Sequence, residues 1–273
     1  MKLAVFGGIY GNLTALSACF AFAEHLGAEG YAFLGDLVGE CPDPSAVVQL
    51  IGQTKAEHPC YFVRGECEEM LIAHKKSPSV ELSGSLQYTF DNLSEQEFDF
   101  IASMPKTARI EIDNCPPIQM CYGSPASLND TLFPGSERAD VALRNLDANT
   151  LLASHLQMQF RYESGGKQLI NPGVIGMHNN HQTKAQFALL DCVTGRWTAR
   201  MLNVDYDREA ELARFDGCDI GGMRTVLVRR SIGLGENRIG ECLSLAQKLA
   251  QVDKNSAVDE TYWETSAKQL GLI

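Results

Sequence analysis

The sequence has no long apolar segment, no closely spaced pair of cysteines and no excess of basic residues. No apolar run approaches the roughly 20 residues of a membrane-spanning helix. The first apolar run, residues 3–6, is also too short for the core of a signal peptide, so we expect a cytoplasmic protein without a membrane partner. The nine cysteines form no C-x-x-C pair, so we expect reduced thiols rather than a disulfide framework.

Basic residues are scarce, because 23 Lys and Arg stand against 34 Asp and Glu and give a net charge of −11. A surface that neutralises a nucleic-acid backbone needs a local excess of positive charge, so we expect no nucleic-acid partner. The chain of 273 residues is long enough to bury a full core. The composition leaves open whether the chain forms a homo-oligomer.

Short apolar strands alternate with helical patterns along the first hundred residues. We predict strands at 2–6, 31–34 and 60–63, and helices at 13–26, 44–54 and from about residue 67. This alternation is typical of a parallel sheet with crossover helices. From Thr107 onward the pattern is β-rich, and after Asp205 it is helical again. We therefore predict an α/β fold in which two layers of sheet have helices outside them.

The loop after the first strand, "FGGIYGN" at residues 6–12, contains no carboxylate, no histidine and no lysine. It opens a helix for which Asn12 is the candidate N-cap, so that backbone N–H groups of the helix N-terminus point at the loop. We predict Gly8, Gly11, Asn12 and, in a later loop, Arg64 as anion-binding residues.

Six loops follow strands, the place where α/β proteins bind their ligands. In chain order they read "GIYGN", "GDLVGECPDP", "GECE", "YGSP", "SHLQMQF" and "NPGVIG". Their order and spacing resemble the motifs of the calcineurin-like metallophosphoesterases, particularly the small bacterial and archaeal phosphodiesterase branch. The resemblance implies a four-layer β-sandwich flanked by helices, with two metal ions at the strand ends. It predicts a domain over residues 1–205 and a C-terminal helical extension over 206–273 packed on the same domain.

Most metal-ligand positions of these motifs hold other residues in this sequence. The resemblance puts Gly8 and Tyr10 where the first motif has its aspartate and histidine. It puts Cys67, Tyr122 and Gln157 at three further histidine positions. Glycine offers no ligand, and tyrosine and glutamine side chains are poor ligands for these ions. We therefore expect no ordinary two-metal centre.

Three residues at ligand positions remain able to bind a metal. The resemblance assigns Asp36 to the bridging aspartate, His155 to the first histidine of the fifth motif, and Glu66 to an asparagine ligand. Such a set suits one Mn, Fe or Zn ion with open positions for water. The alternative is structural: a hydrogen-bonded turn aspartate, a solvated acid and a satisfied buried histidine. His178 and His181, in "GMHNNHQ", are candidate replacement ligands.

Three functional hypotheses follow. The first is a ligand-binding or regulatory protein with little or no family-type hydrolysis, whose ligand is a small phosphate-bearing molecule. The second is a metal-dependent phosphodiesterase or phosphatase that uses the single-metal site. The third is a nucleotide-binding α/β protein, in which the glycine loop approaches the phosphates and Asp36 binds the ribose.

Overall fold

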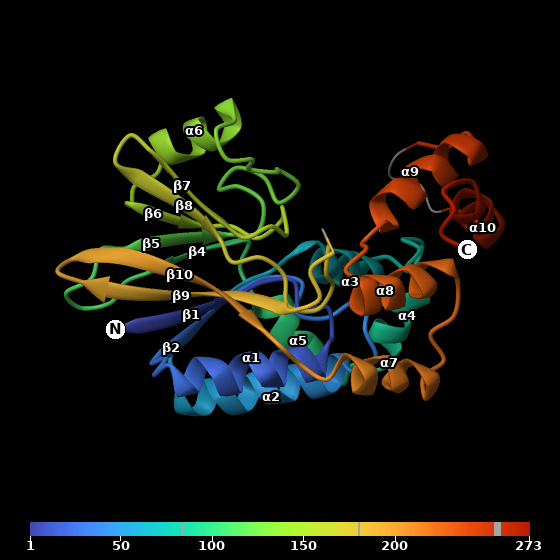
Figure 1. Cartoon of the computed structure of the whole chain (residues 1–273), viewed down its shortest axis with the longest axis horizontal. Coiled ribbons are helices and arrows are strands. Elements are labelled where there is room, and N and C mark those ends of the chain that lie inside the picture. The colour runs from blue at the N-terminus through green and yellow to red at the C-terminus, as the bar shows by residue number, and fades with distance from the viewer. Residues whose placement is uncertain (83, 180, 254–257) are drawn as a thin grey trace.

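The computed structural model describes residues 1–82, 84–179, 181–253 and 258–273. Two five-stranded sheets lie face to face, and helices lie outside them (Figure 1). The predicted α/β fold with two layers of sheet is therefore confirmed.

The first sheet has the strand order β10-β9-β1-β2-β3. Its strands are β1 (Lys2–Phe6), β2 (Gly30–Leu34), β3 (Cys60–Val63), β9 (Ala185–Val193) and β10 (Arg196–Val204). The strands β1, β2 and β3 run parallel, whereas β9 runs antiparallel to β1. Every residue of β2 is buried, as expected for a strand that protein covers on both faces.

The second sheet has the strand order β4-β5-β6-β8-β7. Its strands are β4 (Thr107–Ile110), β5 (Ile118–Cys121), β6 (Thr150–Leu152), β7 (Phe160–Ser164) and β8 (Lys167–Asn171). The strands β5, β6 and β8 run parallel, so the loops that follow them leave the sheet at one edge. The candidate motifs of the β-rich half lie in these loops.

Helices cover both outer faces and one end of the sheets. They are α1 (Leu13–His25), α2 (Pro44–Glu57), α3 (Glu66–Lys76), α4 (Gly84–Asp91), α5 (Glu95–Ser103), α6 (Glu137–Arg144), α7 (Arg208–Asp216), α8 (Met223–Leu234), α9 (Ile239–Ala250) and α10 (Glu260–Gln269). In Figure 1, α1 and α2 lie under the first sheet, α6 lies over the second, and α7 to α10 (orange to red) gather beyond one end. Within the described ranges, none of these helices is both long and apolar enough to span a membrane.

The main core lies between the first sheet and its helices. The Phe6 ring packs edge-on against Phe20, Phe33 and Phe187, with ring centroids 5.3 to 5.7 Å apart. The same core continues into the C-terminal helices, where Trp263 is buried in it. The C-terminal helices are thus joined to the sheet by apolar packing.

α8 lies in the region after Asp205 that was predicted to be helical, and the β-rich pattern matches the strands, but the sequence patterns missed three helices, which are α4, α5 and α6. One of them carried a recognisable start signal, since Ser94 and Glu97 form a capping box at the N-terminus of α5. α4 and α6 have only eight residues each, too few to establish a helical period.

Candidate functional site

Loops from both sheets meet at one edge of the molecule. The Tyr10 N–H, in the loop after β1, donates to the Asp36 carbonyl after β2 at 2.8 Å. In the second sheet, the His155 N–H after β6 donates to the Tyr122 carbonyl after β5 at 3.0 Å. The Tyr122 hydroxyl then donates to the Asp36 carboxylate at 2.5 Å and connects the two sheets. These motif loops therefore form one site.

Three residues of this site have a left-handed backbone that side-chain-bearing residues rarely adopt. The φ angles of Tyr10, Asp36 and Gln157 are 58°, 51° and 54°. Each such residue costs about 1–3 kcal/mol, which the surrounding fold must offset. Strain of this kind concentrates at functional sites, so its presence in three separate loops points to this edge.

The Asp36 carboxylate is the centre of the site and is 1% exposed. Its Oδ2 accepts hydrogen bonds from the hydroxyls of Tyr10, at 2.9 Å, and Tyr122, at 2.5 Å. Its Oδ1 accepts one from the backbone N–H of Cys67 at 2.9 Å. Both carboxylate oxygens are therefore engaged by the protein itself.

Both tyrosines are held in the protonated form that donates to Asp36. Burial raises the pKa of Tyr10 and of Tyr122 well above the ordinary value of 10.0, and the charge of Asp36 raises both further. The Tyr10 hydroxyl in turn accepts a hydrogen bond from Nε2 of Gln157. A chain of neutral groups thus leads from Gln157 to the aspartate.

Glu68 fixes the loops around Asp36, a role that the sequence analysis did not predict. Its buried carboxylate accepts hydrogen bonds from the N–H groups of Asp36, Leu37 and Gly65 at 2.7 to 2.8 Å. Burial raises the pKa of Glu68 to about 7, with a further contribution from Asp36. The available signal was its place three residues after Gly65 at the start of α3, where its carboxylate accepts the N–H of the N-cap residue Gly65.

A buried ion pair joins the site to the C-terminal helices. Glu40, in the loop after β2, is 1% exposed, and Nε of Arg224 on α8 donates to its two carboxylate oxygens at 3.0 and 2.9 Å. The Ser85 hydroxyl also donates to Glu40. Burial opposes the ionised form of Glu40, but Arg224 outweighs it and holds the pKa below 4.5.

A cavity of about 980 Å³ lies between the motif loops and the C-terminal helices. Asp36 and Tyr122 line one side, and Ile239, Leu243 and Trp263 line the other. A space of this size can hold a small molecule. The C-terminal helices therefore form part of the site rather than a separate appendage to it.

The family model for calcineurin-like phosphoesterases matches residues 1–171. The chain belongs to the calcineurin-like phosphoesterase family. The fold of this family member is similar to that of a hypothetical protein from Pyrococcus horikoshii OT3, with a TM-score of 0.76 and 22% identity over 86% of this chain and 98% of that one. It is also similar to a metallophosphoesterase from Sphaerobacter thermophilus, with a TM-score of 0.69 and 17% identity over 86% and 99% of the two chains. No curated protein matches the sequence.

The structure brings the substituted family positions to the cavity. Tyr10, Cys67, Tyr122 and Gln157 all line it. Gly8 is not among the residues that line it; its φ is +58°, and a Cβ there would come within 2.9 Å of Val174. The position that the resemblance assigns to the first metal-binding aspartate of the family is therefore closed to a larger side chain without local rearrangement.

The residue that the resemblance assigns to the bridging carboxylate of a two-metal centre is Asp36. Such a centre needs a carboxylate that bridges both ions. Here the Asp36 oxygens already accept three hydrogen bonds, two of them from tyrosine hydroxyls. Over residues 1–82, 84–179, 181–253 and 258–273, no group of three or more His, Cys, Asp or Glu side chains is arranged to hold a metal ion.

The single-metal site stays a prediction. Asp36, Glu66 and His155 all line the cavity. Nδ1 of His155 lies 3.0 Å from the Asp130 carbonyl oxygen, which orients the ring. Burial raises the pKa of Glu66, and the charge of Asp36 adds to this effect. A metal ion bound by this set would compete with the hydrogen bonds that Asp36 already accepts.

The residues predicted to bind an anion have few N–H groups that are not already donating within the protein. The N–H groups of Gly8 and Gly11 donate to the carbonyls of Gly35 and Leu37 at 3.2 and 2.9 Å. At the N-terminus of α1, the Thr14 N–H donates to a carboxylate oxygen of Glu211 at 3.3 Å.

Arg64, the positively charged residue among those predicted to bind an anion, has an acidic partner. Its Nε lies 2.6 Å from a carboxylate oxygen of Glu69. An anion at this loop would have to compete with carboxylates that the protein supplies. Anion binding by these residues stays a prediction.

Asn12 has a structural role at the start of α1. Its Oδ1 accepts the Ala15 N–H at 2.9 Å, and its Nδ2 donates to the Gly176 carbonyl at 3.0 Å. We expect Asn12→Ala to lower the free energy of unfolding by about 1–2 kcal/mol, measured by urea titration. Asn12→Ser, which keeps an N-cap acceptor and loses the amide donor, should have a stability between those of the parent and the alanine variant. An alanine variant as stable as the parent would contradict this role.

His178 and His181 do not line the cavity. His178 is buried, and its Nε2 lies 2.8 Å from the Tyr206 hydroxyl. Burial lowers the pKa of His178 to about 4, with a contribution from Arg208. The side chain of His181 is 81% exposed. The two histidines therefore have different environments.

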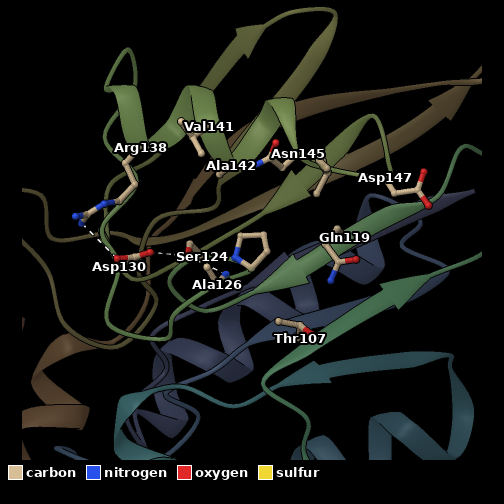
Figure 2. Close-up of a pocket in the computed structure, with 12 residues that line it drawn as sticks. Thr107, Gln119, Ser124, Ala126, Asp130, Arg138, Val141, Ala142, Asn145 and Asp147 are labelled. Carbon is tan, nitrogen blue, oxygen red and sulfur yellow. Dashed lines mark hydrogen bonds and ion pairs between the residues drawn. The ribbon is translucent and has the colours of Figure 1, made fainter.

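A second cavity, of about 330 Å³, lies between α6 and strands β4 and β5. Figure 2 shows Arg138 directed at Asp130, which also accepts a hydrogen bond from the Ser124 hydroxyl at 2.7 Å. The cation of this cavity thus already has a partner. None of the predicted site residues lines the cavity.

Proposed function

We propose that this calcineurin-like phosphoesterase-fold protein binds a small ligand in the cavity of about 980 Å³ and performs little or no family-type hydrolysis. The observation that supports this most strongly is the state of Asp36. Two tyrosine hydroxyls and one backbone N–H donate to its carboxylate, which in the family mechanism would bridge two ions.

The position of the C-terminal helices also supports ligand binding. Arg224 on α8 forms an ion pair with Glu40 in the loop after β2. Leu243 on α9 and Trp263 on α10 line the cavity wall. Apolar walls with a few polar groups at one end are typical of small-molecule sites. A binding protein needs such an enclosure but needs no bound metal.

A second candidate function is a phosphoesterase that uses one metal ion. It is favoured by the common cavity of Asp36, Glu66 and His155, and by the Nε2 of His155, which has no hydrogen-bond partner among the described residues. This set would supply two carboxylates and one imidazole. The metal would polarise a phosphoryl oxygen and activate water.

Metal analysis and a hydrolysis assay distinguish the two functions. We expect protein purified without chelators to contain substoichiometric metal, and to hydrolyse bis(p-nitrophenyl) phosphate with added Mn²⁺ no faster than the buffer does. Stoichiometric metal, with turnover that Asp36→Ala and His155→Ala abolish, would establish the second function instead. His58→Ala, remote from the cavity, is the control for effects of purification.

A further inference from the structure

The cavity wall formed by the motif loops presents hydrogen-bond acceptors. The Tyr122 hydroxyl donates its hydrogen to Asp36, so the lone pairs of its oxygen remain to accept a hydrogen bond from a ligand. The Glu66 carboxylate faces the same space, with no hydrogen-bond partner in the described parts of the chain. A ligand at this wall must therefore bring donors.

Several donors at this wall are already used within the protein. The Gln157 amide donates to Tyr10 and the Arg224 guanidinium to Glu40. The N–H groups of Tyr10 and Gly11 donate to backbone carbonyls. Among the described residues, the donors left at this wall are the second amide N–H of Gln157, the remaining guanidinium N–H groups of Arg224, and Nε2 of His155 when that ring is protonated, because Nδ1 points at the Asp130 carbonyl. A phosphate group, which is recognised by several donors, finds few here.

The charge of the cavity lining is negative. The carboxylates that line it are those of Asp36, Glu40, Glu66, Glu81, Asp219 and Glu260. The side chains there that can be positive are Arg224, which neutralises Glu40, and His155. Asp36 and Glu40 are buried, whereas Glu66, Glu81, Asp219 and Glu260 are exposed. A carboxylate in a buried environment of low dielectric attracts a cation more strongly than an exposed one does.

The rest of the cavity is apolar and aromatic. Its lining includes Met70, Leu82, Ile239, Leu243 and Trp263. Such side chains favour a ligand whose body is hydrophobic. Aromatic rings beside carboxylates are also the usual surroundings of bound ammonium groups.

Resting on the proposed ligand-binding function, we propose that the cavity selects a small organic cation: a protonated amine attached to an apolar or aromatic body. The ammonium group lies at the acceptor wall near Asp36 and Glu66, where its N–H groups meet carboxylate and phenol oxygens. The body lies against the C-terminal helices near Trp263. The ligand charge is thus opposite to that of the phosphate-bearing ligand expected from the sequence.

Three probes of similar size test the sign of the ligand charge. They are phenethylammonium, 2-phenylethanol and phenyl phosphate, each titrated calorimetrically into the full-length protein with a chelator present. We expect phenethylammonium to bind at least about tenfold more tightly than 2-phenylethanol, and phenyl phosphate to bind most weakly. The preference should shrink as salt is added, because charge attraction is screened.

A substitution at the acceptor wall tests the location. Glu66→Gln should weaken phenethylammonium binding by about fivefold and leave 2-phenylethanol binding unchanged, because it removes charge while keeping shape. Glu57→Gln is the matched control, since this exposed carboxylate ends α2 and does not line the cavity. Equal effects of the two substitutions on phenethylammonium would overturn the assignment.

The outcomes separate this inference from the function on which it rests. Tightest binding by phenyl phosphate would overturn the cation preference and leave a ligand-binding cavity in place. Absence of binding by all three probes would overturn both. Metal-dependent turnover, with phenethylammonium still preferred, would overturn only the proposed lack of hydrolysis.

Discussion

Replacing Arg224 with methionine is expected to lower the free energy of unfolding by about 3–5 kcal/mol. The Glu40 carboxylate is 1% exposed, and the guanidinium of Arg224 is its charged partner. Methionine fills much of the space of the arginine stem but brings no charge, so the variant leaves a buried carboxylate unpaired. Urea unfolding followed by circular dichroism measures the loss as a lower midpoint with an unchanged slope.

Two further variants separate the charge effect from general damage to α8. The double variant Glu40→Gln with Arg224→Met contains no unpaired buried charge and should recover most of the lost stability. Arg229→Met, on the same helix, breaks an exposed pair with Asp216 and should cost less than about 1 kcal/mol. If Arg224→Met cost no more than Arg229→Met, this ion pair would not anchor the C-terminal helices.

The sequence predicted those parts of the site that depend on local order. Six motifs in a fixed order located the loops around Asp36, and the structure brings Tyr10, Tyr122 and His155 together at that residue. Strand ends and glycine-rich turns are local features, and a parallel sheet collects them at one edge. This is why the fold and the meeting of the motif loops at one edge followed from sequence patterns, whereas the roles of the site residues stay predictions.

The missed contacts are those that join segments far apart in the chain. Arg224 and Glu40 are separated by 184 residues, and no sequence pattern indicates that the two are in contact. The direction of the tyrosine hydroxyls was equally hidden, because the substitution of a ligand by tyrosine does not say whether its hydroxyl points to Asp36 or to solvent. Such features require the packed structure.

Glu211 is a further buried carboxylate that the sequence did not single out. It lies on α7 and is fully buried, and one of its oxygens accepts the Thr14 N–H while the other has no hydrogen-bond partner among the described residues. The charged pair of Asp43 and Arg214 lies nearby, and the thiol of Cys41 and the hydroxyl of Tyr206 also interact electrostatically with the carboxylate. Burial raises the pKa of Glu211 to about 7, with a smaller contribution from Asp43.

Because of Glu211, the free energy of unfolding is expected to fall by about 3 kcal/mol as the pH rises from 4.5 to 7. Between these values the folded chain keeps a proton that the unfolded chain has released, so raising the pH favours unfolding. The contribution is fully present below pH 4.5 and lost above pH 7. Urea unfolding at a series of pH values measures it.

Glu211→Gln isolates this contribution, because glutamine can still accept the Thr14 N–H but cannot ionise. The variant should match the parent near pH 4.5 and exceed it in stability by about 3 kcal/mol above pH 7. Glu68, whose pKa is also raised to about 7, acts equally in parent and variant, so the difference between their profiles belongs to Glu211. Glu209→Gln, an exposed change on the same helix, should leave the profile unaltered. Parallel profiles for parent and Glu211→Gln would mean that Glu211 is ionised in the folded protein and itself acts as the anion at the N-terminus of α1.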